Sequence, residues 1–149
     1  MIRKAKTSDL PALMGLYDHL RGGLAWTKSK PSAPAPVHAR ALAAMLKMPG
    51  CHVLVSVDHG KVTGTCTLYI LPRVYYTGQP WAVLDTVVVA ENQQGQGQGT
   101  RLIKHAIKMA EKAGCRQVNL TSNTQRTRAH RFYESLGFEG TYIGFKYVF

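Results

Sequence analysis

The sequence predicts one α/β domain (mixed α+β) in which helices flank a mixed sheet, and three observations support this. The chain has 149 residues, the size of one ordinary domain and too short for two well-packed ones. Hydrophobic residues make up 45% and charged residues 18%, which is typical of a packed globular protein. The spacing of apolar residues changes along the chain between about 3.6 residues, typical of helices, and 2 residues, typical of strands. This pattern predicts the order β-α-α-β-β-β-α-β-α-β over residues 1–149.

The first third predicts a short strand followed by two helices. Residues 2–5 form the strand, and apolar residues at helical spacing continue from Leu10 to Tyr17. A second helical pattern covers residues 37–46. Between them, residues 22–36 are rich in Gly, Ser and Pro and cannot continue a helix. We expect this segment to be either a substrate-facing lid or a disordered connector.

The middle of the chain changes to a period of two. Residues 51–57 and 61–70 alternate around the turn Asp58-His59-Gly60, which predicts a β-hairpin. Residues 81–89 form the next strand. Its end, Val87 to Val89, is apolar on both faces and therefore predicts a central strand covered by helices.

The last third predicts two amphipathic helices and two strands. Residues 100–113 place an apolar stripe against a basic face, and Gly114 follows as a C-cap. Residues 117–120 form a strand and residues 126–136 a helix that ends at Gly137. Residues 142–149 alternate again and predict a final strand.

Charge and composition narrow the function classes. The formal net charge is +11, which favours an anionic partner: nucleic acid, a phosphorylated cofactor or an anionic small substrate. The N-terminus has no apolar signal segment and no run is long enough for a membrane span, so we expect a cytoplasmic protein without membrane contact. The three cysteines have neither CxxC nor zinc-ligand spacing, so we expect no disulfide framework and no metal.

The clearest chemical signal is the loop Gln94-Gly95-Gln96-Gly97-Gln98-Gly99 between a strand and a helix. Because glycine has no Cβ, the backbone can approach a ligand closely and direct N–H groups at a phosphate on the positive end of the helix dipole. The GxGxG spacing and the absence of Gly-Lys-Ser/Thr exclude the dinucleotide fingerprint and the P-loop. The loop predicts an anion cradle, to which Arg101 and Lys104 add charge; the alternative is a flexible turn.

This loop resembles the Gln/Arg-x-x-Gly-x-Gly/Ala signature of the GNAT superfamily of N-acetyltransferases, where an apolar strand also precedes it. Downstream, Ala129-His130-Arg131-Phe132-Tyr133-Glu134-Ser135-Leu136-Gly137-Phe138 resembles that family's A-x-x-F-Y-x-x-x-G-F helix. The similarity covers nearly the whole chain except residues 22–36 and 71–80. It implies the GNAT fold, a mostly antiparallel sheet that is splayed between two central parallel strands and flanked by helices.

The resemblance also implies acetyl-CoA as cosubstrate. Backbone groups of Val87 and Val89 would pair with the pantetheine amides like an added strand, the glycine loop would surround the pyrophosphate, and Asn123 would line the gap between the central strands. The predicted cofactor-binding residues are Val87, Val88, Val89, Gln94, Gly95, Gln96, Gly97, Gln98, Gly99, Thr100, Arg101 and Asn123.

Two residues are the predicted catalytic groups. By resemblance, Tyr133 would lie beside the thioester sulfur and act as general acid. An acceptor amine has a pKa of roughly 10 and must lose a proton before it attacks. Asp85, which alternation would place on one face with Val87 and Val89, is the candidate base through a water; His130 or a water chain are the alternatives. Direct attack needs no covalent enzyme intermediate, and a strand N–H near Val87 would stabilise the oxyanion.

The resulting hypothesis is an acetyl-CoA-dependent N-acetyltransferase for the primary amine of a small, anionic substrate. The chain looks closest to family members that act on aminoalkylphosphonates and also resembles glucosamine-phosphate acetyltransferases. Protein lysine or N-terminal acetylation, and a regulatory acetyl-CoA-binding protein, stay open. A non-enzymatic nucleic-acid-binding module is disfavoured, because aromatics are not interleaved with the basic cluster. The resemblance further suggests a homodimer. The aromatics Tyr17, Trp26, Tyr75 and Tyr76 either flank the acceptor pocket or serve packing.

Overall fold

The structure is a computed structural model that describes residues 1–22 and 36–149. The predicted lid or connector at residues 22–36, including Trp26, falls almost entirely outside the described residues. The described chain clusters into two compact units, residues 1–119 and residues 120–149. A single domain over residues 1–149 stays a prediction.

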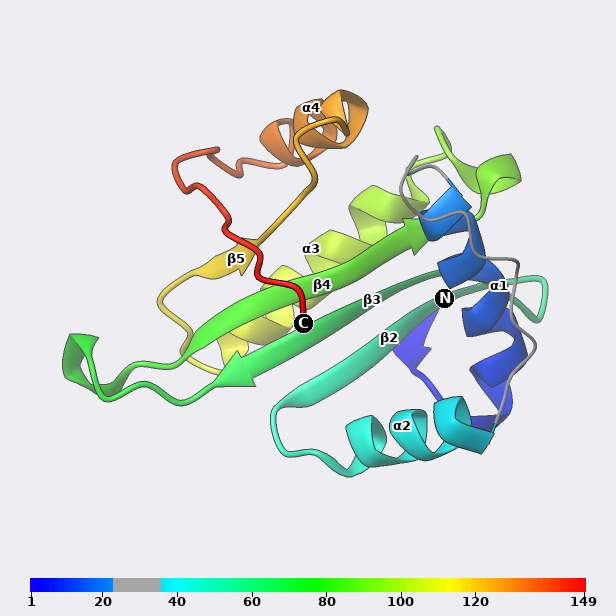
Figure 1. The fold of residues 1–149 in the computed structure, drawn as a ribbon, viewed down its shortest axis with the longest axis horizontal. Helices are drawn as coiled ribbons and strands as arrows, with labels where there is room; N and C mark the ends of the chain where they lie inside the picture. The colour runs from blue at the N-terminus through cyan, green and yellow to red at the C-terminus, as the bar shows by residue number, and fades with distance from the viewer. Residues whose placement is uncertain (23–35) are drawn as a thin grey trace. The chain divides into compact units, whose positions relative to one another are not determined.

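The elements follow the predicted order up to the last strand. They are β1 (Ile2–Lys4), α1 (Leu10–Gly22), α2 (Pro36–Lys47), β2 (Cys51–Asp58), β3 (Lys61–Leu71), β4 (Trp81–Val89), α3 (Gln98–Lys112), β5 (Val118–Leu120) and α4 (Thr127–Glu134) (Figure 1). Short 3-10 turns lie at Thr7–Asp9, Tyr76–Gly78 and Glu91–Gln93. No described helix has both the length and the apolar character that a membrane crossing requires.

The strands form one mixed five-stranded sheet in the order β1-β2-β3-β4-β5. The pairs β1–β2, β2–β3 and β3–β4 are antiparallel. The β2–β3 hairpin turns at His59 and Gly60, which have φ values of 44° and 76°, as a two-residue turn of the primed type requires. β4 has a strand on each side, as its apolar run predicts.

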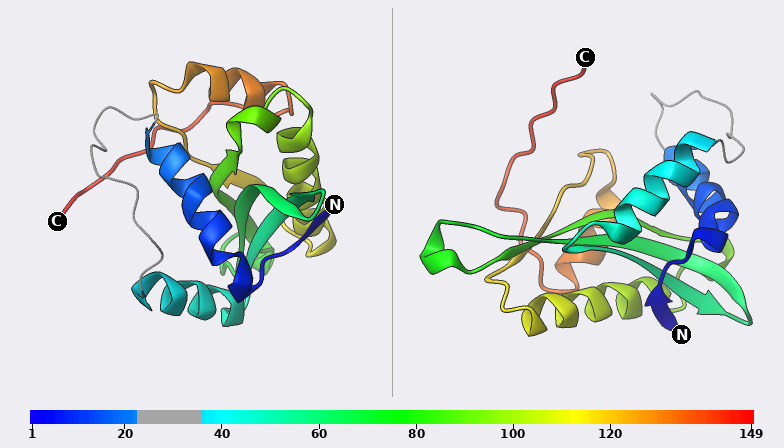
Figure 2. Two further views of the ribbon diagram at one scale, coloured as in Figure 1. Left: turned by 90° about the vertical axis from the view of Figure 1, so that its right-hand side faces the viewer. Right: turned by 90° about the horizontal axis from the view of Figure 1, so that it is seen from below.

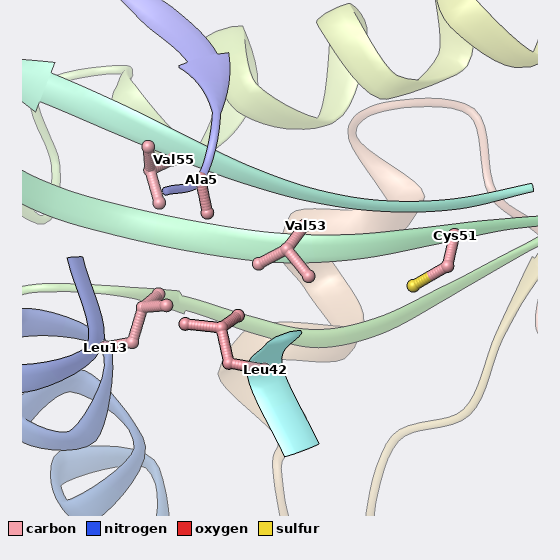
Figure 3. Packing of buried hydrophobic residues seen from close by; sticks show 6 residues of the cluster. All are labelled: Ala5, Leu13, Leu42, Cys51, Val53 and Val55. Carbon is pink, nitrogen blue, oxygen red and sulfur yellow. The ribbon is translucent and has the colours of Figure 1, made fainter. Parts of the chain in front are cut away.

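Helices cover both faces of the sheet in residues 1–119. The helices α1 and α2 lie on one face and α3 on the other (Figure 2). Alternation along β2 divides its side chains between these layers. Ala5, Leu13, Leu42, Cys51, Val53 and Val55 pack together on the α1 and α2 face (Figure 3). Leu54, which lies between Val53 and Val55, alternates to the opposite face of the sheet and is also buried, with 1% of its surface exposed.

The predicted apolar stripe of α3 is largely confirmed. Leu102, Ile103, Ala106 and Ala110 are buried, whereas the basic residues between them are exposed. This face anchors the helix on β2, β3 and β4. The buried stripe begins at Leu102, one turn after the helix starts. Its packing on the sheet fixes the start of α3, and therefore the glycine loop that precedes it, near the end of β4.

The final strand predicted at residues 142–149 is wrong. Residues 139–149 have no regular secondary structure and no strand pairing. The alternation of side chains is present, but a strand also needs a neighbouring backbone to satisfy its N–H and C=O groups. Among the described residues, no strand of the sheet pairs with this segment.

An ion pair fixes the start of α1 to the first strand. Asp9 accepts hydrogen bonds from Arg3 Nη1 (2.7 Å) and Nη2 (2.9 Å) and from the Lys6 N–H (2.7 Å). The Arg3 hydrogen bonds lower the pKa of the Asp9 carboxyl, against an opposing effect of burial. A lowered pKa in the folded state stabilises the fold above the unfolded-state pKa and loses that contribution as pH falls through the folded-state pKa.

We therefore expect Asp9→Asn to lower the free energy of unfolding by about 1–2 kcal/mol at neutral pH, because it replaces a charge-assisted bidentate pair. The difference from the unsubstituted chain should shrink below about pH 4, where the aspartate of the unfolded chain is protonated. Urea unfolding at several pH values measures this. A difference that stays constant down to pH 2.5 would contradict the ion-pair explanation.

Candidate functional site

A β-bulge interrupts β4 at the centre of the sheet. Thr67 pairs with Asp85 and Thr65 with Val88, so between these pairs two residues of β4 stand opposite one residue of β3. The bulge places Thr86 at a φ of 46°, a conformation that β-branched residues rarely adopt. Strained backbone of this kind is concentrated at functional sites.

The bulge corrects the predicted arrangement of side chains on β4. Simple alternation would place Asp85, Val87 and Val89 on one face. The extra residue shifts the phase, so Asp85 and Val88 are the residues opposite the two threonines that share a face of β3. The prediction that Val87 and Val89 share a face with Asp85 is therefore wrong. The backbone of Val87 and Val89 still forms the end of β4.

The Asp85 carboxylate is exposed beside the bulge. Its Oδ1 accepts a hydrogen bond from the Thr86 N–H at 2.8 Å. The Thr86 hydroxyl lies 3.1 Å from that of Thr67, which is fully buried. One carboxylate oxygen is thus held by the backbone, and the carboxylate as a whole faces solvent, where it could accept a proton through a water.

Two phenols lie near this carboxylate. Burial is the largest cause that raises the pKa of Tyr17, opposed by hydrogen bonds to Thr65 and Thr86, and the charge of Asp85 raises it further. Burial likewise raises the pKa of Tyr69, with the charge of Asp85 among the smaller causes. Both phenols therefore keep their protons over a wider pH range and can donate hydrogen bonds in a site around Asp85.

The β3 side of this cluster was not predicted from the sequence. Thr65, Thr67 and Tyr69 alternate along the strand, and a row of hydroxyls on one face of an interior strand is unusual for a purely structural sheet. That alternation was visible in the sequence.

The glycine loop joins β4 to α3 through two residues of positive φ. Gly95 has a φ of 76°, and Gly97, the N-cap of α3, a φ of 72°. The first helical hydrogen bond runs from the Arg101 N–H to the Gly97 carbonyl at 3.0 Å. Since Gly97 has no side chain to cap the helix, the N–H groups of the first turn point out of the helix end, where an anion can bind them.

The glutamine side chains of the loop form hydrogen bonds within the protein, and Gln98 alone among them is buried. Gln98 is buried; its Oε1 accepts from the hydroxyls of Thr63 (2.7 Å) and Ser56 (3.2 Å), and its Nε2 donates to Gln93 Oε1 (2.7 Å). Gln94 Nε2 donates to the Val89 carbonyl at 3.1 Å. The side chains thus hold the loop in shape and leave its backbone for a ligand.

A hollow of about 240 Å³ lies beside the start of α3. Its walls are Met1, Ile2, Ser56, Val57, Asp58, Gln98 and Arg101. The exposed Arg101 has its Nη1 3.5 Å from where a Cβ on Gly97 would be. A guanidinium therefore lies near the start of α3, and the predicted role of Arg101 in binding the cosubstrate stays a prediction.

We expect Gln98→Ala to lower the free energy of unfolding by about 1–3 kcal/mol, because two buried hydroxyls would lose their acceptor. Ligand binding at the loop should weaken as well. Gln96→Ala is the matched control, since Gln96 is exposed and bonds only to the Asn92 carbonyl at 3.1 Å. Urea unfolding of both variants measures the difference, and equal loss in both would contradict the anchoring role.

Residues 120–149 carry the remaining predicted residues. The Asn123 side chain accepts a hydrogen bond from the Gln125 N–H at 2.9 Å, and its carbonyl lies 2.9 Å from His130 Nε2. Because a carbonyl only accepts, His130 Nε2 carries the proton and Nδ1 is the basic nitrogen. Asn123 therefore shapes the turn before α4, and its place beside the central strands stays a prediction.

Tyr133 lies on α4 in a small aromatic cluster. Its ring centroid is 5.5 Å from that of Phe132 and 5.9 Å from that of Phe138. The Tyr133 carbonyl accepts hydrogen bonds from the N–H groups of Leu136 and Phe138, which close the helix. The ring is thus fixed by its neighbours, while its predicted place beside a thioester stays a prediction.

The aromatics of the β3–β4 connection lie at the opposite end of β4 from the glycine loop. The Tyr75 and Tyr76 ring centroids are 4.2 Å apart. Arg116 stacks on Tyr76, with Cζ 4.4 Å from the ring centroid, and Arg73 stacks on Trp81 at 4.3 Å. These contacts favour the packing alternative for Tyr75 and Tyr76.

Comparison with known proteins gives a consistent result. The family model described as "Acetyltransferase (GNAT) family" matches residues 16–138. The aminoalkylphosphonate N-acetyltransferase of Salmonella typhimurium is 29% identical over 69% of this chain; the match spans 66% of that protein, slightly under two thirds. The glucosamine 6-phosphate N-acetyltransferase of Trypanosoma brucei brucei is 28% identical over 92% of this chain and 87% of its own length.

Solved structures share the whole fold. A protein of Agrobacterium tumefaciens strain C58 named as an acetyltransferase superposes with a TM-score of 0.90 at 34% identity, over 99% of both chains.

Proposed function

The chain belongs to the acetyltransferase (GNAT) family and is an N-acetyltransferase; on that premise we propose that it transfers the acetyl group of acetyl-CoA to the primary amine of a small, anionic substrate. The observation that carries the proposal is the continuous path from the bulged end of β4, through Gly95 and Gly97, to the uncapped first turn of α3. This path offers backbone groups first and a positive helix end second, the order in which pantetheine amides and pyrophosphate follow one another in coenzyme A.

The residues that would hold the cosubstrate divide by chemistry. Val87 and Val89 supply backbone groups for the pantetheine amides, and Val88 is buried beneath them. The first-turn N–H groups of Gln98, Gly99 and Thr100, with the Arg101 guanidinium, bind the pyrophosphate. The side chains of Gln94, Gln96 and Gln98 support the loop. In this proposal the glycine loop binds the cosubstrate through backbone groups, so the affinity for acetyl-CoA depends on the positive φ of Gly95 and Gly97.

The transfer itself needs three proton movements at the reacting atoms: two from the nitrogen and one to the sulfur. The acceptor ammonium loses a proton to the Asp85 carboxylate through a water, and the free amine attacks the thioester carbonyl carbon. A strand N–H near Val87 stabilises the oxyanion. The C–S bond then breaks, and Tyr133 protonates the leaving thiolate. The nitrogen loses its second proton to water, and Tyr133 takes a proton back from solvent. The amide and coenzyme A are the products, and no acyl-enzyme forms.

Charge supports an anionic acceptor. The chain has a net charge of +11, and the two curated relatives act on an aminoalkylphosphonate and on glucosamine 6-phosphate, which both carry an amine and a phosphorus oxyanion. Tyr17 and Tyr69, which keep their protons near Asp85, can donate hydrogen bonds to such a substrate.

A thiol-release assay with acetyl-CoA tests the proposal. The informative comparison pairs 2-aminoethylphosphonate with n-propylamine, and glucosamine 6-phosphate with glucosamine, because each pair shares an amine and differs in the anionic group. We expect a preference of at least about tenfold in kcat/KM for the anionic member, since a charge-assisted hydrogen bond contributes about 1.5–3 kcal/mol.

Polyamines and a basic peptide complete the panel. Turnover with the peptide alone would favour protein acetylation. No turnover with any amine, together with acetyl-CoA binding by calorimetry, would favour a regulatory role. A chain that does not bind acetyl-CoA at all would contradict the proposed function.

A further inference from the structure

One face of α3 presents a row of cations to solvent. Lys104, Lys108 and Lys112 are exposed and follow one another about 6 Å apart along the helix axis. The exposed Arg116 continues the row just beyond the helix end, and we call these four residues the basic track. Among the described residues, no ion pair joins the track to a carboxylate, although Glu111 is exposed beside it. The track therefore carries positive charge that the fold leaves available to a partner.

The other face of α3 shows which kind of partner the track fits. Leu102, Ile103, Ala106 and Ala110 are buried, and the helix packs on β2, β3 and β4. A helix that lies on a membrane surface needs an exposed apolar face next to its basic one. Because the apolar stripe of α3 is packed on the sheet, the track fits an anionic and polar partner.

The track ends on a stack of arginine and aromatic side chains. Arg116 Cζ lies 4.4 Å from the centroid of the Tyr76 ring. Arg73 Cζ lies 4.3 Å from the Trp81 centroid and 5.6 Å from that of Tyr76. The ring centroids of Tyr75 and Tyr76 are 4.2 Å apart. These five residues, which we call the stacking platform, gather at the β3–β4 connection, and this connection extends beyond the end of the sheet (Figure 1).

The backbone holds the platform in place and leaves its tyrosines accessible. The Arg116 N–H donates to the Pro80 carbonyl at 2.9 Å, which ties the end of the track to the β3–β4 connection. Tyr76 and Thr77 have φ values of 50° and 56°, which residues other than glycine rarely adopt and which are concentrated at functional sites. Tyr75 is nevertheless 69% exposed and Tyr76 42%.

This combination matches the chemistry of single-stranded nucleic acid. Proteins bind single strands with a charged surface that follows the phosphates and with aromatic side chains on which unpaired bases stack. A guanidinium that stacks by its face keeps its N–H edge for a phosphate. Duplexes and acidic proteins offer charge without such unpaired bases. The sequence separates the tyrosines from the basic helix, whereas the fold brings Tyr76 against Arg116.

The surface is separate from the proposed cosubstrate site. The glycine loop precedes the first residue of α3, and the platform lies beyond its last. The helix has 15 residues and is therefore about 22 Å long. Phosphates bound at the glycine loop would leave the platform uncovered.

We propose that the basic track and the stacking platform together bind single-stranded nucleic acid, with phosphates along the track and bases stacked on Tyr75 and Tyr76. The proposal goes beyond acetyl transfer. The residues that test it lie outside the predicted catalytic and cofactor-binding sets, so thiol release should be retained in every variant below.

Fluorescence anisotropy of the full chain tests the track, with labelled oligo(dT) and oligo(U) of about 16 nucleotides. Saturating coenzyme A is present, so that the oligonucleotide phosphates do not bind at the glycine loop. We expect affinity to fall with salt, and Lys108→Gln/Lys112→Gln to reduce the slope of log K against log[salt] by about 1.4, as for two lost phosphate contacts. Arg40→Gln/Lys47→Gln is the matched control, because it removes two exposed cations from α2 on the other face of the sheet (Figure 2). The control should leave the slope unchanged.

Substitution of Tyr75 tests the platform. Tyr75→Ala should weaken binding of the single strands at least about fivefold, the lower end for loss of one stacked base. Tyr75→Phe should keep the affinity, since the ring remains, and neither variant should change binding to a duplex of the same length. Amide chemical shifts of the unsubstituted chain locate the contact without any variant. Those of residues 72–80 and 108–116 should move when oligo(dT) is added.

Five results would overturn the proposal. They are no binding to either oligonucleotide at low salt, binding that appears only when coenzyme A is left out, an equal change of slope in the α2 control, undiminished binding by Tyr75→Ala, and binding to polyglutamate or anionic vesicles as tight as that to the oligonucleotides. The second result would assign the binding to the glycine loop. The last would mean that the surface attracts any polyanion.

Discussion

Replacing Tyr133 with phenylalanine is expected to lower kcat about 100-fold while leaving the dissociation constant of acetyl-CoA unchanged. General acid catalysis contributes about 10²–10⁴ in rate. The lower end is expected here, because an alkyl thiol has a pKa near that of cysteine, about 8.5, and its thiolate is a tolerable leaving group. The phenylalanine keeps the ring contacts with Phe132 and Phe138, so the fold should be preserved. Steady-state thiol release and calorimetric titration with acetyl-CoA measure the two quantities.

Tyr75→Phe is the control for hydroxyl removal. Tyr75 is 69% exposed on the β3–β4 connection, and its phenylalanine variant should retain full activity. If Tyr133→Phe reduces kcat less than threefold, another group or solvent protonates the thiolate. If it instead weakens acetyl-CoA binding with kcat preserved, Tyr133 helps to bind the cosubstrate rather than to transfer a proton.

Replacing Asp85 with asparagine should lower kcat/KM for the amine by about 10²–10⁴, the range for loss of a general base. Asparagine keeps the side-chain oxygen that accepts the Thr86 N–H at 2.8 Å, so the bulge should persist and only the basic carboxylate is lost. Affinity for acetyl-CoA should not change. Activity measured from pH 6 to pH 10 provides a second readout, because the variant should recover as the amine itself deprotonates near pH 10.

Glu111→Gln is the charge-matched control for this substitution. Glu111 is exposed near the end of α3, so its loss changes the net charge by the same amount away from the bulge. A comparable decrease in both variants would indicate a general electrostatic effect. Full activity of Asp85→Asn, with a large loss in His130→Gln, would assign the base to His130, whose Nδ1 is the basic nitrogen.

Most of the fold followed from local patterns in the sequence. The spacing of apolar residues located every helix and strand up to α4. Each of these segments buries one face, so its own sequence carries the pattern. The loop between β4 and α3 was equally predictable, since Gly95 and Gly97 occupy positions of positive φ that glycine adopts without strain.

Tertiary structure decided what depends on the relation between segments. The bulge at Thr86 arises from the register of β4 against β3, and no local signal marks it. Gln98 turned out to be a buried anchor because the start of α3 lies against the hydroxyls of β2 and β3. The alternation of residues 142–149 was read correctly as a strand-forming pattern, yet no strand forms, because a strand exists only where a second backbone pairs with it. The sequence by itself thus determined the elements and the position of the glycine loop, whereas register, burial and strand pairing required the folded chain.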